Sequence, residues 1–253
     1  MTWTDQQFRQ AVIGWTVLAV PVFFVLFFIS APYGRHAWLG GPKLPGRVAW
    51  LVMEAPSPLV MAWLFATGTH QGDPAAWCFL ALWWLHYFHR AFIYPLRMKG
   101  TPRPMPVPTV VAAMCFNCIN AGFNGEYLFH RAPMFGTAWL LDPRFIVGAL
   151  IFIAGFAINF HADSVLLNLR KPGDTGYKIP FGGLYRYISC PNYFGEVVEW
   201  CGFAIAAWSL PAVAFVMWTA ANLLPRARTN HQWYREKFPD YPSKRKAVVP
   251  FVF

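Results

Sequence analysis

The stretch AVIGWTVLAVPVFFVLFFI, residues 11–29, decides the fold class of this sequence. It contains no charged residue and is about as long as the roughly 20 apolar residues that cross a bilayer as a helix. It lacks the basic leading region and the Ala-x-Ala-like cleavage site of a signal peptide. We therefore interpret it as a transmembrane helix that the mature protein retains.

Similar apolar runs repeat along the whole chain of 253 residues, of which 57% are hydrophobic and 13% charged. With a mean hydropathy of +0.35, this composition excludes a water-soluble globular protein. We predict an all-α integral membrane protein with one membrane-embedded domain over residues 1–253. Its seven predicted transmembrane helices are 11–29, 48–69, 75–96, 107–129, 145–167, 192–209 and 211–227.

A predicted turn at Ser209-Leu210-Pro211 separates the last two helices. Proline is tolerated in the first turn of a helix but breaks its interior, so two short helices are favoured over one long one.

Basic residues alternate between the two sides of this arrangement. Eighteen of the 21 Lys and Arg residues lie in segments 30–47, 90–106, 168–191 and 225–253, and only Arg9, Arg131 and Arg144 lie on the other side. The positive-inside rule then predicts a cytoplasmic C-terminus and an external N-terminus.

The net charge of +10 does not indicate nucleic-acid binding, because the basic residues form no continuous face. We interpret the run Lys244-Arg245-Lys246 as a basic segment lying on anionic lipid. Cys115 and Cys118 form a CxxC without a second pair or a nearby His pair, so no metal site is predicted.

Three polar residues of the N-terminal half, Glu54, Tyr87 and Arg90, stand out because polar and charged side chains are costly inside a bilayer. Glu54 lies in an apolar span, within Met53-Glu54-Ala55-Pro56-Ser57-Pro58, where two prolines loosen the backbone. Tyr87 and Arg90 share a helical face near the end of the next span.

Polar residues also repeat at helical spacing in three predicted helices of the C-terminal half, so each set shares one face. The sets are Asn159 with Asp163, Asn192 with Glu196 and Glu199, and Arg226 with Asn230 and Tyr234. Such faces suit a polar cofactor that approaches from the cytoplasm, where soluble dinucleotides are available. The sequence has neither GxGxxG nor GxxxxGK[ST], so neither a Rossmann crevice nor a P-loop is predicted.

These segments resemble the steroid 5-alpha-reductase family over nearly the whole chain. The similar segments, in the family's order, are Tyr33–His36, Glu54–Ser57, His86–Arg90, Asn159–Asp163, Leu169–Gly173, Asn192–Glu196, Glu199–Gly202, Lys237–Pro242 and Pro250–Phe253. One departure is Met53, which stands where steroid-reducing members carry Gln.

The resemblance implies a seven-helix membrane fold that buries NADPH and reduces the double bond of a 3-oxo-Δ4 steroid or a similar lipid enone. It implies that Glu54 and Tyr87 are the catalytic pair, which hydrogen-bonds the 3-keto oxygen. Residues 145–253 are expected to be mainly cofactor-binding, and the alternatives for the 2′-phosphate contact are Arg103, Arg170 and Arg226. The implied cofactor-binding residues are Arg90, Asn159, Asp163, Arg170, Tyr177, Asn192, Glu196, Arg226 and Tyr234.

The expected chemistry is hydride transfer to the β-carbon of the enone, while Tyr87 and a neutral Glu54 donate hydrogen bonds to the carbonyl oxygen. The substrate is expected to enter from the bilayer. A bacterial inner membrane and an endoplasmic reticulum membrane both fit, and the sequence does not indicate the oligomeric state.

Two other functions remain open at this point. Isoprenylcysteine and phospholipid methyltransferases, which use S-adenosylmethionine, have a segment similar to Pro191–Glu196, and sterol double-bond reductases share the C-terminal half. A seven-helix transporter is the third reading, in which Glu54, Glu126 and Asp163 would relay protons. The pair of Glu54 and Tyr87 favours the 5-alpha-reductase.

Overall fold

Helices make up nearly all the regular structure in the computed structural model, which describes residues 3–29, 41–99, 102–169 and 176–253. The α-helices are α1 (Asp5–Phe28), α2 (Gly46–Glu54), α3 (Pro56–Thr67), α4 (Pro74–Phe88), α5 (Tyr94–Arg97), α6 (Val107–Glu126), α7 (Gly136–Leu140), α8 (Pro143–Asn168), α9 (Pro191–Ala207) and α10 (Leu210–Lys237). Two π-helical segments, η2 (His89–Ile93) and η3 (Tyr127–Arg131), and one 3-10 segment, η4 (Gly183–Arg186), complete the helical elements. Strands β1 (Lys43–Leu44) and β2 (Met105–Pro106) pair antiparallel, so the fold is nearly all-α.

Each of the seven predicted spans falls on helical structure in the described residues. The boundaries differ at both ends of the chain, because α1 begins at Asp5 and α10 continues to Lys237, beyond the predicted limits of 11 and 227. Four helical segments are long and apolar enough to cross a membrane, namely Asp5–Phe28, Gly46–Thr67, Val107–Arg131 and Pro143–Asn168. That the chain crosses the membrane seven times stays a prediction.

Proline and a capping serine set two of the breaks between helices. Between α9 and α10, Trp208 is left-handed with φ of 46°, and the Ser209 side chain accepts a hydrogen bond from the Ala212 amide. Pro211 then lies in the first turn of α10, which confirms the predicted turn. Between α2 and α3, helix α2 ends at Glu54 and α3 begins at Pro56. The break positions the Glu54 carboxylate at a helix end.

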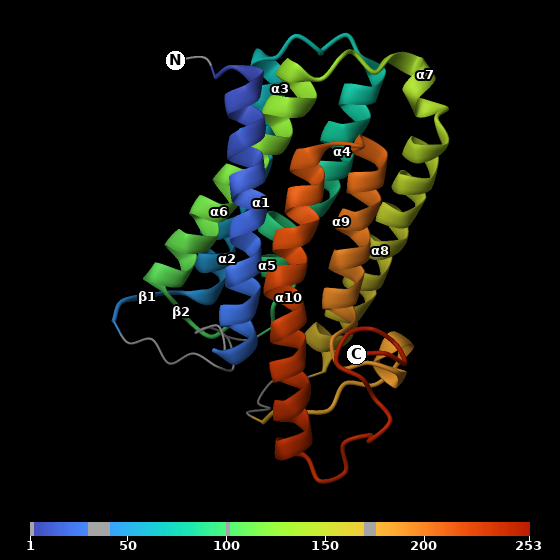
Figure 1. Ribbon diagram of the computed structural model, residues 1–253. Helices are drawn as coiled ribbons and strands as arrows, with labels where there is room; N and C mark the ends of the chain where they lie inside the picture. The colour runs from blue at the N-terminus through green and yellow to red at the C-terminus, as the bar shows by residue number, and fades with distance from the viewer. Residues whose placement is uncertain (1–2, 30–40, 100–101, 170–175) are drawn as a thin grey trace.

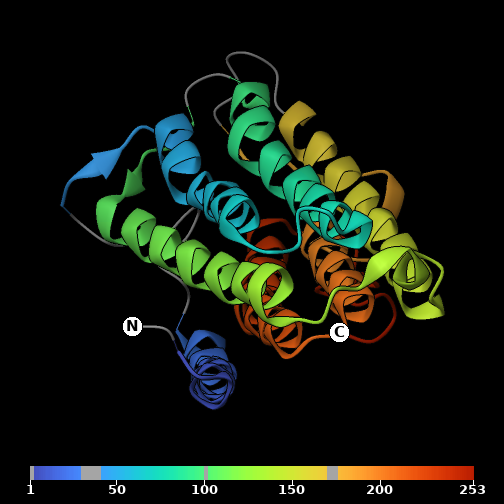
Figure 2. The ribbon, with the colours of Figure 1, turned by 90° about the horizontal axis from the view of Figure 1, so that it is seen from above.

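The long helices form a bundle in which the N-terminus and the C-terminal segment lie at opposite ends (Figure 1). Seen from above, α1 lies at the edge of the bundle (Figure 2), where its outer residues Val17 and Phe24 are exposed. Leu59 on α3 and Leu150 on α8 are exposed as well. Apolar side chains on the outer surface of a bundle are what a hydrocarbon surrounding requires.

The core of the bundle is aromatic and lies between α4, α8 and α9. Trp83, Phe152, Trp200 and Phe203 are all buried in one cluster, with the Trp83 and Trp200 ring centroids 5.3 Å apart. Large rings bury much apolar area at little entropic cost. This aromatic cluster packs against the polar residues His86 and Tyr87 of α4.

Glycines let α8 and α9 touch along their backbones. A Cβ atom on Gly202 would lie 2.3 Å from the Phe152 amide nitrogen, and one on Gly155 would lie 2.3 Å from the Glu199 amide nitrogen. Small residues at such contacts drive helix association in membranes, where there is no hydrophobic force between helices. The close approach brings the polar residues of the two helices together.

Gly202→Ala should lower the thermal stability of the purified protein, because the added methyl group meets backbone atoms that cannot rotate away. We expect a loss of about 1–3 kcal/mol, the usual cost of overpacking. Gly14→Ala is the matched control, since nothing lies within 4 Å of a Cβ there, and it should not lower the stability. Equal melting temperatures for Gly202→Ala and the wild type would show that the helices do not pack this closely.

Candidate active site

Glu54 and Tyr87 are joined by one side chain from α6. The Tyr87 hydroxyl donates to Asn117 Oδ1 at 3.1 Å, and Asn117 Nδ2 donates to Glu54 Oε2 at 3.2 Å. Nδ2 also donates to the Met53 carbonyl oxygen at 2.6 Å, and because that oxygen can only accept, it fixes which end of the amide faces Tyr87. The predicted catalytic pair is therefore brought together, and sequence reasoning missed the residue that links it.

A second buried pair lies next to Tyr87. His86 Nδ1 is 2.9 Å from Glu199 Oε1, and both side chains are almost completely buried. The His86 ring also packs against Trp200, with centroids 4.7 Å apart. The sequence placed Glu199 on one stripe with Asn192 and Glu196, but its partner on α4 was not predicted.

Arg90 joins two acidic side chains in a polar cluster. It comes from η2, where the helix widens to π geometry, a local feature that is frequent at functional sites. Arg90 Nη1 donates to Asp163 Oδ2 at 3.0 Å, and Nη2 lies 3.8 Å from Glu196 Oε2. The guanidinium also lies 4.7 Å from the centroid of the Trp50 ring.

Two asparagines extend this cluster. Asn192 Nδ2 donates to Asp163 Oδ1 at 3.1 Å, and Asn159 Nδ2 donates to the Asn192 carbonyl oxygen at 2.9 Å. Asn159 and Asp163 are 2% and 1% exposed. The structure thus unites five of the predicted cofactor residues: Arg90, Asn159, Asp163, Asn192 and Glu196.

Three further predicted cofactor residues, Tyr177, Arg226 and Tyr234, contact aromatic side chains. Arg226 Nε donates to the Tyr193 hydroxyl at 2.7 Å, and Tyr234 stacks on Tyr241 with ring centroids 5.3 Å apart. Tyr177 packs against Trp233 at 4.7 Å. Arg170 lies outside the described residues, as does the Tyr33–His36 segment.

Of the three alternatives for the phosphate contact, Arg103 is held over the Tyr177 ring, with its guanidinium 5.1 Å from the centroid. This contact brings a basic residue from the segment before α6 beside a predicted cofactor residue.

Ser189 ties the C-terminal segment to α10. Its hydroxyl lies 2.6 Å from His231 Nδ1 and 2.7 Å from the Tyr241 hydroxyl. Burial lowers the pKa of His231, and the charges of Arg235 and Lys246 lower it further. The imidazole is therefore held neutral and can accept or donate in this network. Within the described residues, no group of three His, Cys, Asp or Glu side chains is placed to hold a metal ion.

Comparison with known proteins identifies the family. The family model for 3-oxo-5-alpha-steroid 4-dehydrogenase matches residues 103–253. The chain is 44% identical to 3-oxo-5-alpha-steroid 4-dehydrogenase 1 of Bos taurus, over 93% of each chain. It is 43% identical to the protein of that name from Homo sapiens, over 88% of this chain and 87% of the other.

A plant relative agrees with these matches. A steroid 5-alpha-reductase of Gossypium hirsutum is 41% identical, over 94% of each chain. The similarity extends from the apolar N-terminal helices through the C-terminal half, and it confirms the resemblance that the sequence motifs indicated. The chain therefore belongs to the 3-oxo-5-alpha-steroid 4-dehydrogenase family, the steroid 5-alpha-reductases, and is an oxidoreductase.

Proposed function

We propose that this enzyme uses NADPH to reduce the carbon–carbon double bond of a 3-oxo-Δ4 steroid or a related lipid enone. The observation that carries the proposal is the hydrogen-bonded set of Tyr87, Asn117 and Glu54, in which two potential donors are bonded to the same amide side chain. A 3-keto oxygen needs such donors. The names of the relatives, which are steroid dehydrogenases and reductases, support the same substrate class.

The polar cluster around Arg90 has the chemistry that a dinucleotide requires. Asp163 and Glu196 can accept hydrogen bonds from ribose hydroxyl groups, and the amides of Asn159 and Asn192 can both donate and accept. Asn159 and Asp163 are buried and Asn192 and Glu196 are partly buried in an otherwise apolar bundle, where polar side chains are expensive unless they have a function. With the C-terminal group they form the proposed NADPH site: Arg90, Asn159, Asp163, Arg170, Tyr177, Asn192, Glu196, Arg226 and Tyr234.

When bound, NADPH would supply a hydride to the β-carbon of the enone, and a proton added at the α-carbon would complete the reduction. The role of Tyr87 and of a protonated Glu54 is to donate hydrogen bonds to the carbonyl oxygen, where enolate charge develops. For this, the Tyr87 proton turns from Asn117 Oδ1 to the substrate, while Asn117 keeps its own bond to the Met53 carbonyl. The aromatic core beside them excludes water, which strengthens these hydrogen bonds.

In the membrane orientation proposed from the charge pattern, NADPH and the steroid would enter the protein from different sides. The C-terminal end of the bundle would face the cytoplasm, the source of NADPH, while the steroid or enone would enter between helices from the lipid. A C-terminal reporter that is active only outside the cytoplasm would contradict this orientation. The family matches do not favour the methyltransferase or the transporter.

Asn192→Ala should weaken NADPH binding to the detergent-purified protein by about 1–3 kcal/mol, the usual cost of leaving a buried polar partner unsatisfied. The partner here would be the bound nucleotide, and Asp163, which loses its 3.1 Å hydrogen bond from Asn192, would also be less well positioned for it. Binding can be followed by titrating nucleotide fluorescence. Asn168→Ala, an exposed asparagine at the end of α8, is the matched control and should bind as the wild type does. Unchanged NADPH affinity in Asn192→Ala would show that the nucleotide does not bind at this cluster.

A further inference from the structure

A pocket separate from the candidate active site lies between η4 and the segment that follows α10. Its volume is about 560 Å³. The residues that line it are Arg186, Arg245, Phe181, Tyr187, Pro242 and the Gly182–Gly183 turn.

The two walls of this pocket are fastened together by backbone hydrogen bonds. The Ser189 amide donates to the Lys246 carbonyl oxygen at 2.9 Å, and the Lys246 amide donates to the Tyr187 carbonyl oxygen at 2.9 Å. The Cys190 amide adds a bond of 3.0 Å to Ala247. The walls are therefore held in place before any ligand arrives, which lowers the entropic cost of binding.

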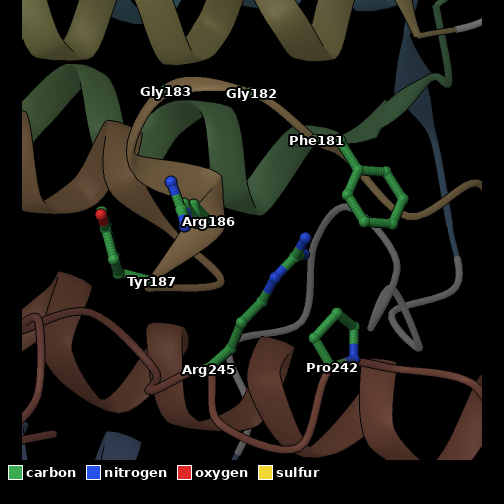
Figure 3. Close-up of a pocket in the computed structure, with 7 residues that line it drawn as sticks. All are labelled: Phe181, Gly182, Gly183, Arg186, Tyr187, Pro242 and Arg245. Carbon is green, nitrogen blue, oxygen red and sulfur yellow. The ribbon is translucent and has the colours of Figure 1, made fainter.

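Arg245 differs from the two lysines beside it. Lys244 and Lys246 are exposed, as expected for a basic segment on lipid, whereas Arg245 is only 3% exposed. Its guanidinium lies 4.9 Å from the centroid of the Phe181 ring and extends into the pocket (Figure 3). Among the described residues, Nε and Nη1 have no hydrogen-bond acceptor. The guanidinium also contacts Tyr241, 5.2 Å from its ring centroid, but two of its nitrogen atoms stay without an acceptor, which is costly in a buried group unless a ligand supplies one.

Arg186 adds a second positive charge to the same pocket. In the described part of the chain, neither arginine forms an ion pair with a carboxylate. Two uncompensated guanidinium groups over one pocket match the oxygen atoms of a phosphate, which arginine binds through paired N–H donors.

The rim of the pocket is apolar. The exposed fractions of Phe181 and Tyr187 are 63% and 38%, and the nearby Phe251, whose ring centroid lies 5.4 Å from that of Tyr187, is 76% exposed. Aromatic side chains of this kind gather at the level of lipid headgroups. The segment after α10, which supplies Pro242 and Arg245 to the pocket, lies at the end of the bundle opposite the N-terminus (Figure 1).

We propose that Arg186 and Arg245 form a binding site for one phosphate group at the membrane surface, in a pocket distinct from the proposed NADPH site. The phosphate can be that of an anionic phospholipid or a free phosphate ion. Both sources present the same oxygen atoms to the two arginines, and only the lipid also covers the aromatic rim.

The test measures the melting temperature of the full-length protein in a phosphate-free maltoside detergent. Dioctanoyl phosphatidylglycerol, dioctanoylglycerol and inorganic phosphate are added in separate titrations. At about 100-fold excess over its Kd, the phospholipid should raise the melting temperature of the wild type by about 5 °C or more. Dioctanoylglycerol, which has the same chains without phosphate, should not. An equal rise with inorganic phosphate would support the site and identify a free ion as its ligand.

Three variants decide whether the two arginines are responsible. Arg245→Gln and Arg186→Gln should each weaken the response by about tenfold or more in ligand concentration, because each loses charge-assisted hydrogen bonds. Lys244→Gln removes the same charge from an exposed neighbour and should respond as the wild type does. Arg245→Gln should be close to the wild type in stability without ligand, since it removes a buried charge that the protein satisfies only in part. If it fails to fold, Arg186→Gln, at an exposed position, carries the test.

Equal responses of Arg245→Gln, Arg186→Gln and the wild type would overturn the proposal, and so would an equal loss in Lys244→Gln, which would indicate diffuse charge. Affinity for NADPH in the same detergent should be unchanged in Arg245→Gln. A parallel loss of NADPH affinity would assign this arginine to the nucleotide instead. Failure of the wild type to bind NADPH would leave the phosphate result intact, so the two proposals fail separately.

Discussion

Tyr87→Phe is expected to slow the single-turnover reduction of a 3-oxo-Δ4 steroid by roughly 10²–10³-fold, the usual effect of removing one preorganised donor from a developing oxyanion. The substitution keeps the ring, which is stacked on Trp83 with centroids 5.3 Å apart, and deletes only the hydroxyl. The core packing should therefore survive. Stopped-flow oxidation of bound NADPH measures the rate directly.

Binding of NADPH to Tyr87→Phe should remain at the wild-type level, because the hydroxyl contacts Asn117 and not the cluster around Arg90. Tyr127→Phe, in the π-helical segment η3, makes the same chemical change outside the site and should react as the wild type does. A wild-type rate in Tyr87→Phe would remove this tyrosine from the proposed chemistry.

Asp163→Asn is expected to destabilise the protein by about 3–5 kcal/mol, the cost of breaking a buried ion pair on one side. Asp163 is 1% exposed and accepts from Arg90 at 3.0 Å. Glu196, at 3.8 Å from the other guanidinium nitrogen, would be the remaining charged partner of a largely buried cation. For a chain of this size the loss corresponds to a fall in melting temperature of about 6–20 °C.

Asp142→Asn is the matched control for that variant. Asp142 pairs with Arg144 at 2.8 Å near the end of the bundle, and hydrogen bonds from Arg144 lower the pKa of Asp142 to about 2. Its side chain also accepts from the Arg144 amide at the start of α8, a capping role that asparagine fills equally well. The control should therefore melt close to the wild type. If Asp163→Asn and Asp142→Asn melt at the same temperature, the ion pair between Arg90 and Asp163 does not stabilise the protein.

Helical spacing predicted which polar residues share a face, and the structure confirms this for Asn159 with Asp163. Proline and serine at positions 209–211 predicted the turn between the last two helices. These features are local, since they depend on residues within one or two turns of each other. Local chemistry is readable from one sequence.

The contacts between helices were not predictable in this way. Periodicity does not give the rotation of one helix relative to its neighbours, so neither the link through Asn117 nor the partner of Glu199 on α4 was found. The same limit applies to Arg245, which the sequence places in a basic surface run but which the structure buries. The predicted limit of 227 lies near the end of the apolar run, whereas α10 continues through polar residues to Lys237, because a helix can extend beyond the part of it that is apolar.

The most direct test of the proposed function follows an isotope through one turnover. The purified protein is loaded with NADPH that carries deuterium at both positions of nicotinamide C4 and is mixed with a 3-oxo-Δ4 steroid. The account predicts one steroid reduced for each NADPH oxidised, with deuterium on the former β-carbon and an intact 3-keto group. Deuterium at C3, or steroid left unreduced while NADPH is bound, would contradict it.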